Sequence, residues 1–263
     1  MSAVGAPTGR VSHVTVLGGS SMLVWGGTNG AGRLNTGGRY GLGEDEWHAL
    51  STEGPGNEPL VAREQHAAVW YDAMLLVFGG IGDVGNQLGV TLPTSAPESG
   101  GKLYDAAMDK WKSPSATDQP SARAGCSAVR SNLKPANQMT VIVWGGQDGN
   151  VFRDSGAQFS PSYNSWKPMG MPAPEARSGH GAVWLEGPAR MAVWGGRGAN
   201  GVLASGGLFD PKSNTWDKMT PLGPSAREGH TAVSTGKELI IWGGKAGDKV
   251  LGDGARLDPA KIQ

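Results

Sequence analysis

The chain has 263 residues, enough to bury a substantial core in one or two domains. Its 23 basic and 23 acidic side chains balance, so no broad cationic field is present to attract nucleic acid or an anionic membrane. The single cysteine, Cys126, excludes an internal disulfide framework and a zinc site made of cysteines. No apolar run approaches the roughly 18 residues of a membrane helix, and no signal-peptide pattern is seen, so we expect a cytoplasmic protein.

Glycine and tryptophan are unusually frequent, with 44 and 10 residues. A glycine-rich chain could be a disordered linker, but disordered chains are poor in aromatic residues. Here both residue types recur in register along the chain. Regularly spaced glycine beside regularly spaced tryptophan indicates many short strands joined by tight turns.

A repeat with three marks runs along the chain. The marks are an arginine with a histidine three residues later, an apolar run that ends in two glycines, and a later tryptophan. In chain order the arginines are Arg10, Arg63, Arg123, Arg177 and Arg227. The first glycines of the pairs are Gly26, Gly79, Gly145, Gly195 and Gly243, and the tryptophans are Trp47, Trp111, Trp166 and Trp216. The third repeat has Cys126 in place of the histidine.

Each repeat is predicted to hold four short antiparallel strands. The segment HGAVW (180–184) alternates small and apolar residues, and MAVW (191–194) is a continuous apolar run typical of a strand buried on both faces. The segment SGGLFDPKSNTW (205–216) predicts a strand, a turn and the start of another strand, since Asp-Pro and Ser-Asn favour turns. Four such strands cannot bury a core alone, so the repeats must pack on one another in a radial arrangement.

The remaining marks are Tyr104-Asp105 or Phe209-Asp210-Pro211 after the glycine pair, with a tryptophan six residues after the aspartate. With these marks, nearly the whole chain resembles a Kelch-repeat β-propeller. The resemblance implies an all-β propeller whose blades each have four antiparallel strands. The five repeats predict five blades in a single domain of residues 1–263, either as a small closed ring, which we favour, or as part of a longer propeller. The blades would begin near residues 10, 63, 123, 177 and 227.

The repeated residues are expected to serve the architecture. The glycine pairs end the second strand, where the backbone turns tightly and a Cβ would obstruct the next blade. The residues before them wedge between adjacent sheets: Trp25, Phe78, Trp144, Trp194 and Trp242. The repeat arginines are expected to anchor neighbouring carbonyls. The repeat histidines are expected to make structural hydrogen bonds, with a shared metal site as the alternative.

The N-terminal segment is expected to close the ring. Pro7 stands three residues before Arg10, and the same offset holds Pro120, Pro174 and Pro224 in later repeats. We therefore predict that residues 2–6 supply the fourth strand of the last blade, which would leave no exposed sheet edge.

Function is sought where the repeats differ, because repeated residues build the scaffold. The resemblance implies that ligands meet the loop before the first strand and the loop after the glycine pair, at the axial mouth. The candidate catalytic residues there are Glu64 and Glu228. The candidate ligand-binding residues are Ser12, Thr28, Gln65, Gln147, Ser178, Arg197 and Lys245.

Two insertions and two further tryptophans interrupt the repeat. Residues 81–102 are expected to form a lid or a peptide-gripping loop over the mouth, or else a tolerated surface insertion. Residues 130–138 are expected between the first and second strands of their blade. Trp70 and Trp184 are expected to fill the core between sheets, or to stand exposed as binding anchors.

Two functions are compatible with these residues. The first is a binding module that recognises a peptide, a protein or a small ligand at the mouth. The alternative is an isomerase, epimerase or cyclase in which Glu64 and Glu228 act as base and acid while Arg197 and Lys245 stabilise an oxyanion. We expect no cofactor, no metal, no nucleic-acid or membrane partner, and a monomer.

Overall fold

The computed structural model describes residues 1–83, 95–98, 100–219 and 223–258. These residues form short β-strands and two 3-10 turns, η1 (Pro55–Asn57) and η2 (Ala136–Gln138). The chain divides into two compact units, and each is described by itself. The first unit is Met1–Ala116 with Ser121–Ala124, and the second is Thr117–Pro120 with Gly125–Gln263.

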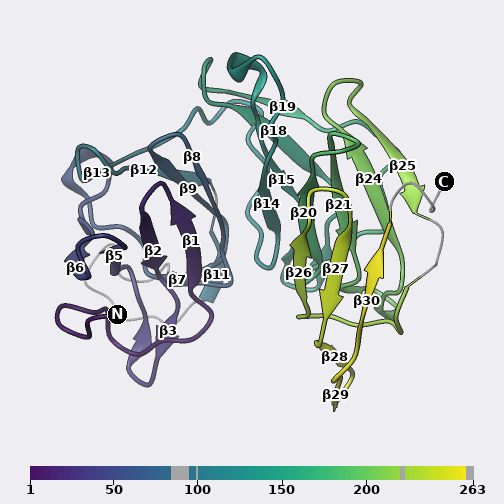
Figure 1. Cartoon of the computed structure of the whole chain (residues 1–263), viewed down its shortest axis with the longest axis horizontal. Coiled ribbons are helices and arrows are strands. Elements are labelled where there is room, and N and C mark those ends of the chain that lie inside the picture. The colour runs from purple at the N-terminus through teal and green to yellow at the C-terminus, as the bar shows by residue number, and fades with distance from the viewer. Residues whose placement is uncertain (84–94, 99, 220–222, 259–263) are drawn as a thin grey trace. The chain divides into compact units, whose positions relative to one another are not determined.

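The first unit contains two four-stranded antiparallel sheets, blades one and two (Figure 1). Blade one has the order β1-β2-β5-β6 and blade two the order β13-β12-β9-β8. The strands of blade one are β1 (Val14–Gly18), β2 (Ser21–Trp25), β5 (Gly37–Gly41) and β6 (Glu46–Ala49). Those of blade two are β8 (Ala67–Tyr71), β9 (Met74–Phe78), β12 (Gly101–Asp105) and β13 (Lys110–Lys112).

The second unit contains blades three, four and five. Blades three and four are four-stranded and antiparallel, and blade five has three strands among the described residues. Blade three contains β14 (Ser127–Arg130), β15 (Val141–Trp144), β18 (Gly156–Ser160) and β19 (Ser165–Pro168). Blade four contains β20 (Gly181–Leu185), β21 (Arg190–Trp194), β24 (Gly206–Asp210) and β25 (Thr215–Met219). Blade five contains β26 (Thr231–Ser234), β27 (Leu239–Trp242) and β30 (Gly254–Leu257).

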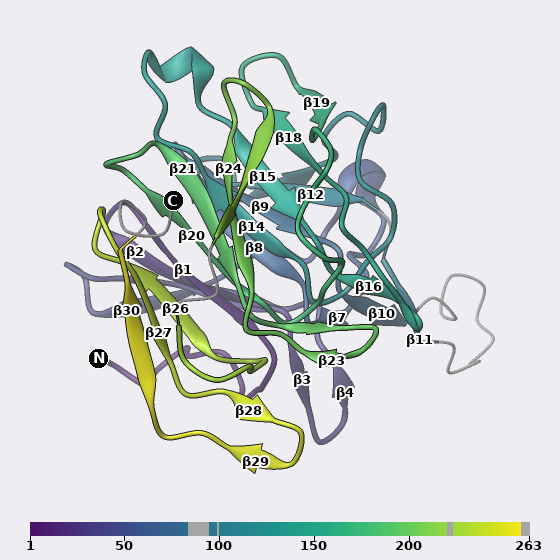
Figure 2. The same ribbon diagram turned by 90° about the vertical axis from the view of Figure 1, so that its right-hand side faces the viewer.

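A short antiparallel pair of strands follows each glycine pair, before the third long strand of the blade. In Figures 1 and 2 the pair of blade five, β28–β29, projects beyond β27 and β30. The pairs are β3 (Thr28–Asn29) with β4 (Gly32–Arg33), β10 (Ile81–Asp83) with β11 (Ser95–Pro97), β16 (Gln147–Asp148) with β17 (Val151–Phe152), β22 (Arg197–Gly198) with β23 (Gly201–Val202), and β28 (Lys245–Ala246) with β29 (Lys249–Val250). In blade two, β10 also pairs with β7 (Arg63–Glu64).

In blade four the glycine pair occupies positions that a side chain cannot fill, as predicted. Gly195 and Gly196 have φ of +67° and +91°. A Cβ on Gly196 would lie 2.6 Å from the Ser178 carbonyl oxygen, and a Cβ on Gly195 would lie 2.6 Å from the ring of His230. The turn therefore needs glycine for both its backbone conformation and its close neighbours.

The repeat arginines anchor backbone carbonyls, which confirms the prediction. Arg177 is buried, and its Nη1 donates to the carbonyls of Gly195 at 3.0 Å and Ser205 at 2.7 Å. Arg10, Arg63 and Arg227 also donate to the carbonyl of the first glycine in their own blade. Each guanidinium thus satisfies carbonyls at the end of the second strand that the ladder leaves free.

Adjacent blades within each unit meet through a tryptophan–histidine ring contact. Trp25 lies edge-on to His66 with ring centroids 5.1 Å apart, and the Trp144–His180 and Trp194–His230 pairs are at 5.1 Å and 5.4 Å. The expected structural hydrogen bond is present for His180, whose Nε2 lies 2.9 Å from Ser127 Oγ. Both ring nitrogens of His230 are buried without a hydrogen-bond partner among the described residues, so the hydrogen-bond prediction is wrong for His230. His66 is placed by its ring contact with Trp25.

A backbone hydrogen bond accompanies each of these ring contacts. The N–H of the second glycine donates to the carbonyl of the next repeat arginine, from Gly27 to Arg63, Gly146 to Arg177 and Gly196 to Arg227, each at 2.8 Å. The ring pair and this bond together form the junction between two blades. Trp70 and Trp184 pack against the adjoining cores, as expected.

The N-terminal segment does not supply a strand to the last blade, so that prediction is wrong. Residues 2–6 contain no strand, and they lie against blade one. The backbone N–H of Ser2 donates to Asp45 Oδ1 at 2.7 Å, and Trp47 Nε1 donates to the Ser2 carbonyl at 3.1 Å. In blade four the last strand ends at Met219, eight residues before Arg227, and eight residues before Arg10 is Ser2. Residues 2–6 therefore correspond to the linker that follows a fourth strand.

The protein should become less stable as the pH is lowered, because His66 is buried in its neutral form. Burial, helped by the positive charge of Arg63, lowers the pKa of His66 to about 3. In the unfolded chain the imidazole takes up a proton below about pH 6.5, whereas in the folded protein it stays neutral. The contribution of His66 to the free energy of unfolding is therefore fully present above that pH and is lost as the pH falls towards the folded-state pKa. We expect His66→Gln to reduce the pH slope of the free energy of unfolding by up to about 1.4 kcal/mol per pH unit in urea unfolding. A slope equal to that of the wild type would contradict the assignment.

The glycine pair should tolerate no side chain. Gly196→Ala is expected to lower the free energy of unfolding by more than about 2 kcal/mol, because it combines an unfavourable φ with overlap on the Ser178 carbonyl. Gly149→Ala is the matched control, since Gly149 has a φ of +56° and open space around it. It should cost only about 1 kcal/mol. Denaturant unfolding of the two variants measures the difference, and equal losses would refute the overlap.

Candidate functional site

The two loops that sequence analysis assigned to the ligand lie side by side within a blade. The residue after the repeat arginine pairs with the residue after the glycine pair as isolated bridges between Val11 and Thr28, Ser178 and Arg197, and Glu228 and Lys245. In blade two, Glu64 pairs with Ile81 through β7 and β10. Six of the predicted site residues thus belong to these pairs: Thr28, Glu64, Ser178, Arg197, Glu228 and Lys245.

Side chains from one blade also reach these residues in the next blade. Arg197 holds Glu228 with Nε 3.1 Å from both carboxylate oxygens and Nη2 2.9 Å from Oε1. In the first unit, Arg33 Nε donates to Glu64 Oε1 at 3.0 Å. The two predicted catalytic carboxylates are therefore ion-paired. They stand in different units, Glu64 in the first and Glu228 in the second.

The uncharged candidates divide into paired and exposed residues. The hydroxyl of Ser178 donates to Gln147 Oε1 at 2.7 Å, and the hydroxyl of Thr28 donates to the Gly32 carbonyl at 3.0 Å. Ser12 and Gln65 are exposed, with φ of +55° and +54°. Glycines hold this position in the other repeats, at Gly125, Gly179 and Gly229. Left-handed backbone costs a residue with a Cβ about 1–2 kcal/mol, so Ser12 and Gln65 bear strain that their glycine counterparts lack.

The strain at Gln65 predicts a stabilising substitution. Gln65→Gly should raise the free energy of unfolding by up to about 1 kcal/mol, because it relieves the left-handed backbone and removes only an exposed side chain. Gln147→Gly should lower it, since Gln147 has ordinary backbone and accepts the Ser178 bond. Urea unfolding tests both, and a less stable Gln65→Gly variant would contradict the strain.

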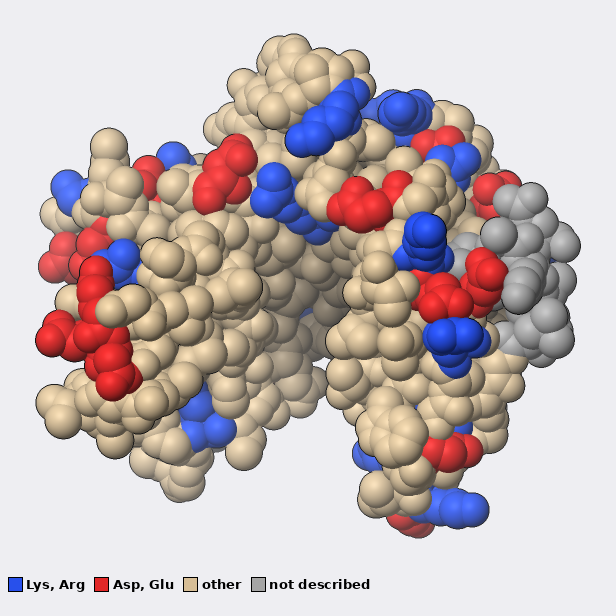
Figure 3. Space-filling model, in the orientation of Figure 1, with Lys and Arg blue, Asp and Glu red and all other residues tan. Residues whose placement is uncertain are grey.

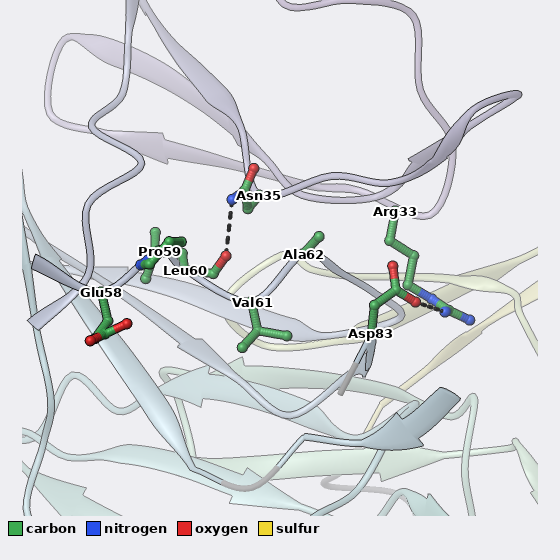
Figure 4. Close-up of a pocket in the computed structure, with 8 residues that line it drawn as sticks. All are labelled: Arg33, Asn35, Glu58, Pro59, Leu60, Val61, Ala62 and Asp83. Atoms are coloured by element: carbon green, nitrogen blue, oxygen red, sulfur yellow. Dashed lines mark hydrogen bonds and ion pairs between the residues drawn. The ribbon is translucent and has the colours of Figure 1, made fainter. Parts of the chain in front are cut away.

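A cavity of about 720 Å³ lies in the first unit beside Arg33 (Figure 4). Its volume falls within the range of about 300–1,000 Å³ that ligand sites occupy. β4 contributes Arg33, the end of β10 contributes Asp83, and the linker between blades one and two contributes the floor. The lining residues are Arg33, Asn35, Glu58, Pro59, Leu60, Val61, Ala62 and Asp83.

The linker makes the cavity because it is longer than the others. Trp47 precedes Arg63 by 16 residues, whereas Trp216 precedes Arg227 by 11. The added residues form η1, and the Gly54 N–H before it donates to the Glu58 carbonyl after it at 2.7 Å. Asn35 Nδ2 then holds the Leu60 carbonyl at 2.9 Å and fixes the floor against blade one.

Charge is concentrated at the two ends of the cavity. At one end Arg33 lies between Glu64 and Asp83, at 3.0 Å and 2.5 Å. At the other end Glu58 stands exposed, and Val61 and its neighbours lie between the two ends (Figure 4). The cavity therefore presents an apolar floor between two polar ends.

Sequence analysis missed Arg33 and the linker, although signals for both were present. Arg33 pairs with Thr28, and the residues in its place in blades three, four and five are Phe152, Val202 and Val250. Comparing the last residue of each short strand pair would have shown this difference. Of the expected lid, residues 81–102, positions 84–94 and 99 lie outside the described residues. The described ends pair as β10 and β11.

Charged side chains of both signs are interspersed on the face shown in Figure 3. Acidic side chains gather near β6, where Glu44, Asp45 and Glu46 are consecutive. Asp45 accepts hydrogen bonds from the Tyr40 hydroxyl and the Ser2 N–H, and Glu44 pairs with His48 at 3.2 Å. These contacts define a surface turn. Within the described ranges, no three or more His, Cys, Asp or Glu side chains are grouped to hold a metal ion.

The five sheets, their short strand pairs and their junctions define a β-propeller with five blades, mainly of four antiparallel strands. The family model of the KLHDC2/KLHL20/DRC7 Kelch-repeats domain matches residues 2–167 and 135–263. The chain therefore belongs to the Kelch-repeat family, whose propellers typically mediate protein binding. No curated protein matches the chain. Among the described residues, no helix has the length and apolar character needed to span a bilayer.

Proposed function

We propose that the chain is a protein-binding module and that the cavity beside Arg33 takes an extended segment of the partner. The observation that carries the proposal is the cavity's layout, with Pro59, Val61 and Ala62 between polar ends. An extended segment alternates its side chains, so it can place an apolar residue on this floor while its polar groups meet Arg33 or Glu58.

The positions of the charged groups favour binding over catalysis. An acid or base that exchanges protons with a substrate must be within hydrogen-bond reach of it. Glu64 is held by Arg33, and Glu228 is held by Arg197 with Lys245 Nζ at 3.8 Å. In both ion pairs the glutamate carboxylate accepts hydrogen bonds from an arginine of the preceding blade, so it joins two blades. The enzyme alternative stays a prediction that no contact of the described residues supports.

The proposal also gives a role to Gln65, one of the ligand-binding residues predicted from the sequence. Gln65 directly follows Glu64, which contacts Arg33 at the end of the cavity. In our proposal, a partner segment that extends past Arg33 and Glu64 contacts the exposed Gln65 amide. In this arrangement the strained backbone at Gln65 would be retained because its side chain contacts the partner.

Selection from a library of random peptides displayed on phage tests the function. Peptides that bind the wild-type chain should lose at least about tenfold in affinity for Val61→Asp, because a carboxylate on the floor must be desolvated by an apolar side chain. Val151→Asp is the matched control, since Val151 is an exposed valine of the second unit. Fluorescence anisotropy of the labelled peptides measures the affinities, and thermal unfolding verifies that both variants fold.

The outcomes are distinct. Loss of binding with Val61→Asp but not Val151→Asp supports the cavity as the site. Peptides that bind both variants as tightly as the wild type would overturn it, and an equal loss in both would show that the peptides recognise another feature.

A further inference from the structure

The cavity beside Arg33 carries more negative than positive charge. Its lining contains one cation, Arg33, and two carboxylates, Glu58 and Asp83, all in the first unit. Arg33 also binds Glu64, so one positive and three negative groups give these four side chains a formal charge of −2. The whole chain is neutral, with 23 basic and 23 acidic residues. The negative excess is therefore a property of this cavity and not of the molecule.

The accessible charged group at each end of the cavity is a carboxylate. At one end Arg33 is already held by Glu64 at 3.0 Å and by Asp83 at 2.5 Å. The Arg33 side chain is 18% exposed, whereas that of Asp83 is 48% exposed. At the other end Glu58 is exposed and forms no ion pair with the described residues (Figure 4). A partner thus meets Asp83 at one end and Glu58 at the other.

Covering the floor changes what these two carboxylates require. An apolar side chain placed on Val61 displaces water from the floor and from the groups at its ends. A carboxylate that loses water is costly unless a cation pairs with it. A basic side chain on the partner supplies that cation, whereas an acidic one adds a like charge to an end that is already negative.

We propose that the segment which occupies the cavity is basic. One apolar residue lies on the floor, and a lysine or arginine on each side of it pairs with Glu58 or Asp83. This inference rests on the proposed function and names the chemistry of the partner that the cavity selects. At the Arg33 end the partner's cation contacts Asp83, and Arg33 keeps its bond to Glu64.

The phage-displayed peptides selected on the wild-type chain are the probe. Compared with the unselected library, they should be enriched in lysine and arginine and depleted in aspartate and glutamate. Because ion pairs at exposed groups are screened by salt, their affinity should fall as the ionic strength rises from about 0.01 M to about 0.15 M, where the Debye length shortens from about 30 Å to about 8 Å.

Neutral substitutions of nearly the same shape test the two carboxylates. Glu58→Gln and Asp83→Asn should each weaken binding of a fluorescein-labelled peptide about two- to fivefold at low salt, as expected for exposed ion pairs. Glu53→Gln is the matched control, because Glu53 is exposed on the same linker and does not line the cavity. It should leave the affinity unchanged. Fluorescence anisotropy measures the affinities, and circular dichroism melting shows that each variant folds.

A double-mutant cycle links a peptide residue to its carboxylate. Replacing one lysine of the peptide by glutamine should weaken binding to the wild type, and the loss should be smaller with whichever of Glu58→Gln and Asp83→Asn lacks the partner of that lysine. The loss should be undiminished with Glu53→Gln. An equal loss in all four proteins would contradict the pairing.

Val61→Asn separates this inference from the proposed function, because it makes the floor polar without changing its charge. If Val61→Asn weakens binding while Glu58→Gln and Asp83→Asn do not, the cavity binds the segment but the segment is not selected for basic residues, and this inference is overturned. If none of the three variants changes the affinity, the proposed function fails as well. Selected peptides that are enriched in acidic residues would also overturn the inference.

Discussion

The junction between neighbouring blades is the contact on which the rest of this molecule depends. A four-stranded sheet of some fifty residues has two apolar faces and cannot be stable with either exposed. Trp194 and His230 show how the chain meets this constraint, because their rings meet where the Gly195-Gly196 turn leaves no side chain in the way. The bond from Gly196 to Arg227 then fixes the distance between sheets. Without glycine at the turn, neither the rings nor the backbones could approach.

Most of the fold was predictable from the sequence because each structural requirement recurs in every repeat. A single Gly-Gly pair is weak evidence, but five pairs in register with arginine and tryptophan leave few other folds. The histidine role was misjudged because a ring that packs and a ring that accepts a hydrogen bond leave the same mark in a sequence. His180 does both, whereas His230 packs on Trp194 without a hydrogen bond from its ring among the described residues. The N-terminal segment was misplaced because its proline offset fits a linker as well as a strand end.

The candidate site was less predictable, since it arises from irregularity. Glu64 and Glu228 were predicted as site residues because the other repeats have different residues at their position. In the structure each forms an ion pair with an arginine from a neighbouring blade. The cavity depends on linker length and on Arg33, and its shape follows from how η1 folds the added residues back. The position of a glutamate within the sequence repeat does not reveal which arginine or lysine its carboxylate contacts. Only the three-dimensional structure, which places Arg33 on β4 beside Glu64 on β7, does so.

The nearest-neighbour character of the junctions bears on how the protein would yield to mechanical force. Because each ring pair and each glycine–carbonyl bond joins only successive sheets, a load applied to the chain is carried by one junction at a time. We expect extension in an optical trap to proceed as a series of steps of blade length, with each rupture exposing one tryptophan. The three ring pairs have nearly the same centroid separation, 5.1–5.4 Å, so each step would break the same kind of contact.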